Sequence, residues 1–118
     1  VGRVTSEIKA ERDRRIQVGG YKVADKWYHS DTFSRTQQMG LVTLGANIPA
    51  GTLWRTMDGS TVTMNQDLAS QIFGSAVASD IAIFAAAEAH ILAVQEASDP
   101  SAYDFSSGWP PSFEDVGD

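Results

Sequence analysis

The sequence predicts an α+β domain in which three helices and two β-hairpins are organised around one long C-terminal helix. Two observations lead to this class. Apolar residues recur every three or four positions through residues 65–98 without an internal proline, which indicates a helix. Segments of alternating polarity at residues 20–29 and 52–64 each surround a turn, which indicates antiparallel hairpins rather than a parallel sheet.

The first predicted element is a helix over residues 4–17. Gly19 and Gly20 end it, because glycine adopts the left-handed capping conformation without a steric penalty. Ile8 and Ile16 lie two turns apart and give a narrow apolar stripe. This helix is either a solvated element held by two isoleucines or the end of an oligomerising stalk, and the lack of a sustained heptad repeat favours the first.

The middle of the chain predicts a hairpin at residues 20–29 and then a helix at residues 31–46. The hairpin turns at Ala24 and Asp25, and its returning strand is rich in aromatic residues. Asp31 lies where an N-cap belongs, since its carboxylate can accept a backbone hydrogen bond from the first turn.

A second hairpin at residues 52–64 turns at Asp58-Gly59, the residue pair typical of tight turns. Asn65 then caps the long helix, which at about 1.5 Å per residue would span roughly 50 Å. Such a helix either bends near Gly74 and Ser75 or reaches a partner with its far end. The apolar residues on which the other elements are expected to pack are Leu68, Ile72, Phe73, Ala76, Val77, Ile81, Phe84, Ile91 and Val94.

Asp99-Pro100 ends the long helix, because a residue before proline is disfavoured in the helical region. Residues 1–100 are therefore predicted as one domain and residues 101–118 as an extended tail. Aromatic rings in the tail favour burial, so the tail either folds back over its own domain or docks on another chain. The candidate partner-docking residues are Tyr103, Phe105, Trp109, Pro110 and Phe113.

Composition narrows the classes of function. The chain has no cysteine and a net charge of −6, and every Lys and Arg lies at or before Arg55. Acidic residues interrupt that basic half and the whole chain repels phosphate, so nucleic-acid binding is not expected. No apolar run approaches the roughly 20 residues of a membrane span, so none is predicted. The chain, which begins at Val1, is expected to be a soluble fragment or a C-terminal piece of a longer protein.

No catalytic, metal or cofactor constellation is predicted. His29 lies near Asp31 and His90 near Glu88, but no nucleophile or third ligand accompanies either pair. His90 and Glu88 are two residues apart on a helix and point in different directions. An alternative from another class is a carbohydrate-binding or enzymatic site formed by Trp27, His29, Trp54 and Asp58, which requires both hairpins to converge on one open cleft.

A set of short motifs resembles a bacteriophage and prophage domain of unknown function, found at the C-terminal end of tail-fibre and tail-fibre-assembly proteins. The residues that carry this resemblance are Gly19-Gly20, Lys26-Trp27, His29-Ser30-Asp31, Ser34-Arg35, Gln37, Gly51-Thr52, Trp54, Thr56, Asp58-Gly59, Val62-Thr63 and Ser107-Gly108-Trp109-Pro110. The resemblance covers about residues 8–97 and the Gly-Trp-Pro ending, and it implies a setting rather than a reaction.

The resulting expectation is a non-enzymatic structural or adaptor module of a phage tail, in the tail fibre, the baseplate or the receptor-binding apparatus. Its expected partners are other phage tail proteins, and a trimer is expected by analogy with tail fibres. The expected location is the virion tail, or the host cytoplasm during assembly. The alternative is a tail-fibre assembly chaperone that does not remain in the particle.

Overall fold

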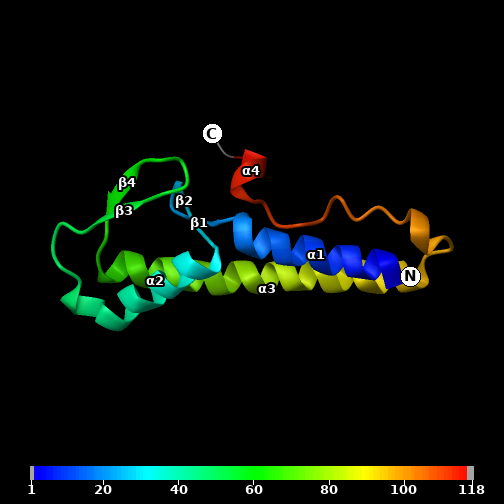
Figure 1. Ribbon diagram of the computed structural model, residues 1–118, viewed down its shortest axis with the longest axis horizontal. Coiled ribbons are helices and arrows are strands. Elements are labelled where there is room, and N and C mark those ends of the chain that lie inside the picture. The colour runs from blue at the N-terminus through cyan, green and yellow to red at the C-terminus, as the bar shows by residue number, and fades with distance from the viewer. Residues whose placement is uncertain (1, 117–118) are drawn as a thin grey trace.

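The computed structural model describes residues 2–116 and confirms the α+β class (Figure 1). The elements are α1 (Gly2–Val18), β1 (Tyr21–Val23), β2 (Lys26–Tyr28), α2 (Thr32–Leu44), the 3-10 helix η1 (Gly45–Asn47), β3 (Leu53–Arg55), β4 (Thr61–Thr63), α3 (Gln66–Glu96), the 3-10 helix η2 (Pro100–Ala102) and α4 (Phe113–Val116). Within the predicted tail, residues 117–118 lie outside the described part.

The long helix α3 determines the shape of the molecule. It has 31 residues and continues through Gly74 and Ser75 without a break. Asn65 caps it as predicted, since its side-chain oxygen accepts a hydrogen bond from the Leu68 amide at 2.8 Å. The molecule is accordingly elongated, with extents of 58 × 28 × 20 Å.

One side of the C-terminal half of α3 is covered by the same chain. Helix α1 runs antiparallel to it, and the tail returns beside both helices (Figure 1). Val4 and Ile8 of α1 pack with Ala87 and Val94 of α3, and all four side chains are buried. The far end of α3 therefore meets α1 and the tail on one of its sides.

The N-terminal half of α3 carries a second apolar core. Helix α2 and the first hairpin pack on Ala69, Ile72 and Ala76 of α3. Tyr21 and Tyr28, opposite each other in the hairpin register, are both 2 % exposed. Burial raises the pKa of Tyr21 to about 12, because an ionised phenol would lose its hydration.

Each hairpin is a separate two-stranded antiparallel ribbon, and the turn of the second ribbon contacts a strand of the first. Tyr21 pairs with Tyr28 in the first, and Trp54 with Val62 in the second. The Met57 amide donates a hydrogen bond to the Trp27 carbonyl at 2.9 Å, which links the second turn to β2. The ribbons therefore do not form one sheet.

By length and composition alone, α3 is long and apolar enough to cross a membrane, although no membrane span was expected from the sequence. Only Asp80 and Glu88 are charged between residues 68 and 95, and they divide this segment into shorter apolar stretches. Core helices of globular proteins pass the same test, so this property alone is weak evidence.

Candidate functional site

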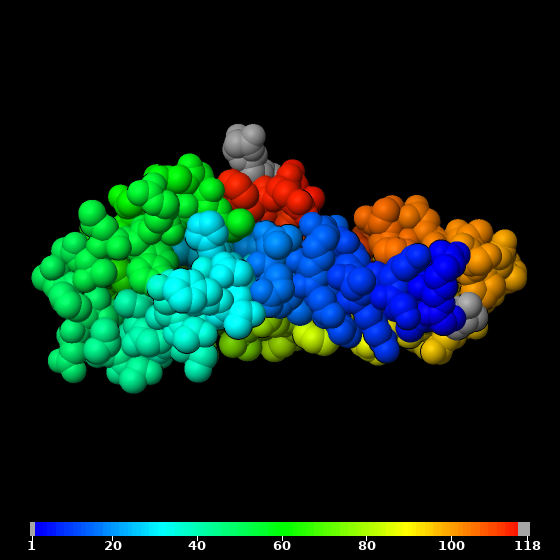
Figure 2. Space-filling view, in the orientation of Figure 1, coloured from blue at the N-terminus to red at the C-terminus, as the bar shows by residue number. Residues whose placement is uncertain are grey.

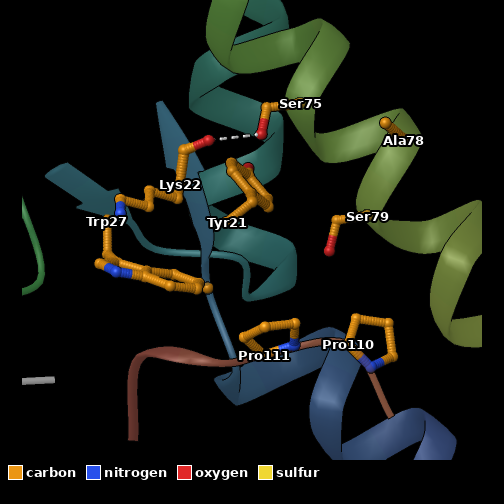
Figure 3. A pocket seen from close by; sticks show the side chains of 9 residues that line it. Tyr21, Lys22, Trp27, Ser75, Ala78, Ser79, Pro110 and Pro111 are labelled. Carbon is orange, nitrogen blue, oxygen red and sulfur yellow. Dashed lines mark hydrogen bonds between the residues drawn. The ribbon is translucent and has the colours of Figure 1, made fainter. Parts of the chain in front are cut away.

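A groove of about 460 Å³ lies between the first hairpin, α3 and the tail. Figure 3 shows Trp27 and Tyr21 on one side of it, Ser75, Ala78 and Ser79 of α3 on another, and Pro110 and Pro111 closing the base. The Ser75 hydroxyl donates a hydrogen bond to the Lys22 carbonyl at 2.9 Å, which fixes the hairpin on α3. This lining is mainly apolar and suits the burial of rings or aliphatic groups.

Gly19 and Gly20 allow the close approach that builds this groove. Gly20 has a φ of +75°, and a Cβ there would lie 2.3 Å from the Met57 sulfur. A Cβ at Gly19 would lie 3.2 Å from the Ser112 Cβ, and the Gly19 carbonyl accepts a hydrogen bond from the Phe113 amide at 2.8 Å. Gly19 and Gly20, which end α1, are therefore also the point at which the turn of the second hairpin and the tail contact the start of the first hairpin.

The side chains considered for carbohydrate binding are divided between different places. Trp27 faces the large groove and makes an edge contact with Phe113. His29 and Trp54 line a separate depression of about 240 Å³. Asp58 accepts hydrogen bonds from Thr56 and Ser60 of its own turn and from Lys26 of β2, and the Ser60 side-chain hydrogen bond lowers its carboxyl pKa. The single cleft that this hypothesis requires is absent from residues 2–116.

The tail residues proposed for docking are held on their own domain. Tyr103, Phe105 and Trp109 are half-buried against the core formed by α1 and the end of α3. The Trp109 indole donates a hydrogen bond to the Phe105 carbonyl at 2.7 Å, and the Arg15 guanidinium lies 5.2 Å from the Trp109 ring centroid. Pro110 lines the groove. Of the two alternatives for the tail, the structure shows the one in which it folds back.

His90 is the centre of this tail attachment. Its Nδ1 lies 2.7 Å from the Tyr103 hydroxyl and its Nε2 lies 2.7 Å from the Ser107 carbonyl oxygen. A carbonyl only accepts, so Nε2 carries the proton and the Tyr103 hydroxyl donates to Nδ1. The Trp109 ring lies 5.3 Å from the imidazole, centroid to centroid. His90 therefore acts as a structural anchor, with both nitrogens occupied.

The apolar residues of α3 divide into a buried face and an exposed face, which corrects the expectation that all of them pack inside the domain. Ile72, Ile83 and Val94 are at most 5 % exposed. The exposed members are Phe73 (39 %), Val77 (45 %), Ile81 (65 %), Phe84 (45 %) and Leu92 (57 %), and we call this set the apolar face of α3. Part of α3 is seen uncovered beneath α1 along the lower edge of Figure 2.

No group of three or more His, Asp or Glu side chains suited to a metal ion occurs within the described residues. His29 is exposed on the hairpin and lies far along the chain from His90. Asp31 caps α2 instead of pairing with His29: it accepts hydrogen bonds from the Ser34 amide at 3.1 Å and the Ser34 hydroxyl at 2.7 Å.

These features define a small, elongated α+β domain with a tail fixed on its core and an uncovered apolar helix face. The chain belongs to the family described as Domain of unknown function (DUF4376), whose model matches residues 2–107. The matched region runs from α1 to the His90 contact at Ser107 and ends before Trp109. No curated protein and no solved structure matches the chain.

Proposed function

We propose that this chain is a non-enzymatic structural or adaptor module of a bacteriophage tail that acts through protein–protein contacts. The observation that supports contact as the function is the apolar face of α3. Exposed apolar patches of several hundred Å² are uncommon on monomers and mark interaction sites. The exposed parts of the face's five large side chains and of the alanines between them amount to roughly 600 Å².

A protein surface suits this face better than a lipid bilayer. The Arg12 guanidinium lies 4.7 Å from the Phe84 ring centroid, and Arg35 forms an ion pair with Asp80 beside the face. Glu88 is exposed within it. Insertion of α3 into hydrocarbon would require burial of all these charges, which is expensive, whereas a protein interface leaves Arg12, Arg35 and Asp80 at its solvated rim.

The phage-tail setting is supported by the motif resemblance over residues 8–97 and at Trp109-Pro110. The partners we propose are other tail proteins, in the tail fibre, the baseplate or the receptor-binding apparatus. The proposed location is the virion tail, or the host cytoplasm during assembly. Because Tyr103, Phe105 and Trp109 are occupied within the chain, we place the contact surface on α3 rather than on the tail.

The test is to introduce Ile81→Arg into the phage genome and to quantify the protein in purified particles by mass spectrometry. We expect the wild-type protein in stoichiometric amounts and a severalfold loss for the variant. The matched control is Phe33→Arg, since Phe33 is 71 % exposed on α2 and lies outside the face. A wild-type protein that is needed for fibre assembly but missing from particles would instead identify an assembly chaperone, and equal incorporation of both variants would refute the role of the face.

A further inference from the structure

The exposed side of α3 has a heptad pattern formed by residues that do not pack in the core of the chain. Six exposed residues follow one another at alternating spacings of four and three: Gly74, Ala78, Ile81, Ala85, Glu88 and Leu92. This is the a/d spacing of a coiled-coil seam over nearly three heptads. We call these six residues the α3 seam. It spans about 27 Å at 1.5 Å per residue.

We propose that the occupant of the apolar face is a second copy of this chain, packed antiparallel through the α3 seam about a two-fold axis at the level of residue 83. The proposal rests on the contact function proposed above and names the partner of the same surface. A two-fold interface must be complementary to itself, because each copy presents the same residues.

The order of residue sizes along the seam meets that condition. With the axis at residue 83, Gly74 of one copy faces Leu92 of the other, and Ile81 faces Ala85. Ala78 faces Glu88. Every layer thus pairs a large side chain with a small one, as interdigitated packing requires. The Gly74 position is open, since a Cβ there would meet no atom within 4 Å.

The edges of the seam fit the same arrangement. Val77 and Phe84 lie on one edge, which faces the same edge of the second copy. With the axis at residue 83, the two Phe84 side chains are about 3 Å apart along the helices and would meet each other, which buries their exposed parts. Ala82 and Ala89 lie on the other edge and are exposed and small. One edge is thus apolar and bulky in both copies, while the other permits close approach of the helices.

The position of a charged residue favours the antiparallel arrangement over a parallel one. Glu88 is the one charged residue of the seam and it is exposed. In the antiparallel pair the two Glu88 residues are about 15 Å apart along the helix axis. A parallel in-register dimer or trimer instead brings the Glu88 side chains of all copies into one layer, where they repel each other. A parallel assembly also stacks Gly74 on itself and leaves a void. The observed residue order therefore favours a two-fold pair over the threefold assembly expected by analogy.

The available area is of the right size. The apolar surface of roughly 600 Å² on each copy approaches the about 800 Å² per partner that a standard interface buries, before any rim contacts are counted. Arg12, Arg35 and Asp80 border the seam without lying in it, so they would remain at the solvated rim.

The first experiment is sedimentation equilibrium of the full chain over a concentration series, with and without lipid vesicles. We expect a particle of twice the 12.7 kDa chain mass. Ala85→Arg should raise the dimer dissociation constant at least tenfold, because it places a charged chain against Ile81, while Phe33→Arg leaves it unchanged. Glu88→Leu should lower the constant, since it removes the charge from the seam. A monomeric wild type, or a dimer that Ala85→Arg does not weaken, would overturn the proposal, as would a monomer that binds vesicles.

The second experiment measures helix orientation. The chain lacks cysteine, so a single spin label can be attached to Ser70→Cys, an exposed position at the edge of the seam. The antiparallel pair puts the two labels about 39 Å apart along α3, whereas a parallel pair puts them roughly 10 Å apart. Ala82→Cys, next to the axis, should give a short distance. A short distance at both positions would contradict the proposed orientation.

The results also separate this inference from the phage-tail proposal. A dimer in solution that is absent from particles and unnecessary for assembly would leave the seam pairing intact and refute the tail function. Stoichiometric incorporation into particles of a chain that is monomeric in solution would support the tail function and refute the seam pairing.

Discussion

Arg35 and Asp80 form a two-pronged ion pair that joins α2 to α3. The Arg35 Nη1 atom lies 2.7 Å from Asp80 Oδ2, and Nη2 lies 2.9 Å from Oδ1. The same guanidinium donates hydrogen bonds to the carbonyls of Ile16 and Ser30. One side chain therefore ties α1, the start of α2 and the middle of α3 together, through partners up to 45 residues apart in the sequence.

Arg35→Ala should lower the free energy of unfolding by about 2–3 kcal/mol, because it leaves Asp80 without its partner and two carbonyls without their donor. Urea denaturation measures this. The control is Arg3→Ala, whose ion pair with Glu7 is exposed on both sides and should contribute at most about 0.5 kcal/mol. Equal losses for the two variants would show that Arg35 does not hold the three helices together.

The N-cap of α2 predicts a dependence on pH. The Ser34 side-chain hydrogen bond lowers the pKa of Asp31 below its usual 3.8. The stabilisation from the ionised cap is therefore present above the unfolded-state pKa near 3.8 and is lost as the pH falls through the lower folded-state value.

Asp31→Asn should keep most of the stability at pH 7, since asparagine also caps, and should reduce the loss of stability as the pH falls below 3.8. Asp31→Ala should cost about 1 kcal/mol at pH 7. Thermal melts across this pH range test both variants. If the asparagine variant lost as much stability at low pH as the wild type, the pH dependence would come from other carboxylates.

His90→Ala should release the tail, because the Tyr103 hydroxyl and the Ser107 carbonyl both lose their partner. We expect chymotrypsin to cleave after Tyr103 or Phe105 at least tenfold faster, since proteolysis of native proteins follows local opening. His29→Ala is the matched control, as His29 is exposed on the hairpin. Cleavage at the wild-type rate would mean that the half-buried rings alone retain the tail.

Gly20→Ala should destabilise the protein by about 1–3 kcal/mol. The φ of +75° disfavours any side chain, and a Cβ would lie 2.3 Å from the Met57 sulfur and 3.0 Å from the Tyr28 carbonyl oxygen. Gly40→Ala is the opposite control: Gly40 is helical with nothing within 4 Å, so this change should stabilise α2 by about 0.5–1 kcal/mol. A stable Gly20→Ala variant would show that the two ribbons can separate.

Local signals predicted the element boundaries. Asp31 and Asn65 cap the helices at which they were expected, and Asp58-Gly59 turns the second hairpin. These features depend on residues within a few positions of one another, so the sequence contains the whole interaction. The additional turns of the tail, η2 and α4, are short and have no periodicity by which they could be recognised.

The candidate surface was not predictable in the same way. Helix α3 is apolar around most of its circumference, so the period of its residues does not distinguish Ile72, which is buried, from Ile81, which is 65 % exposed. The heptad spacing from Gly74 to Leu92 can be read in the sequence. That spacing indicates a free interaction surface only once the structure shows that the opposite side of α3 is covered.

The amino-acid sequence by itself determined which segments are helices and ribbons and where each one stops, because caps, turns and periodicity act over a few neighbouring residues. Only the tertiary structure decided which side of α3 faces α1, that the tail returns to His90, and that Arg35 meets Asp80. The physical reason is that these contacts join segments far apart in the sequence. Several of those segments could pack on the same helix, and only the folded chain fixes which of them does.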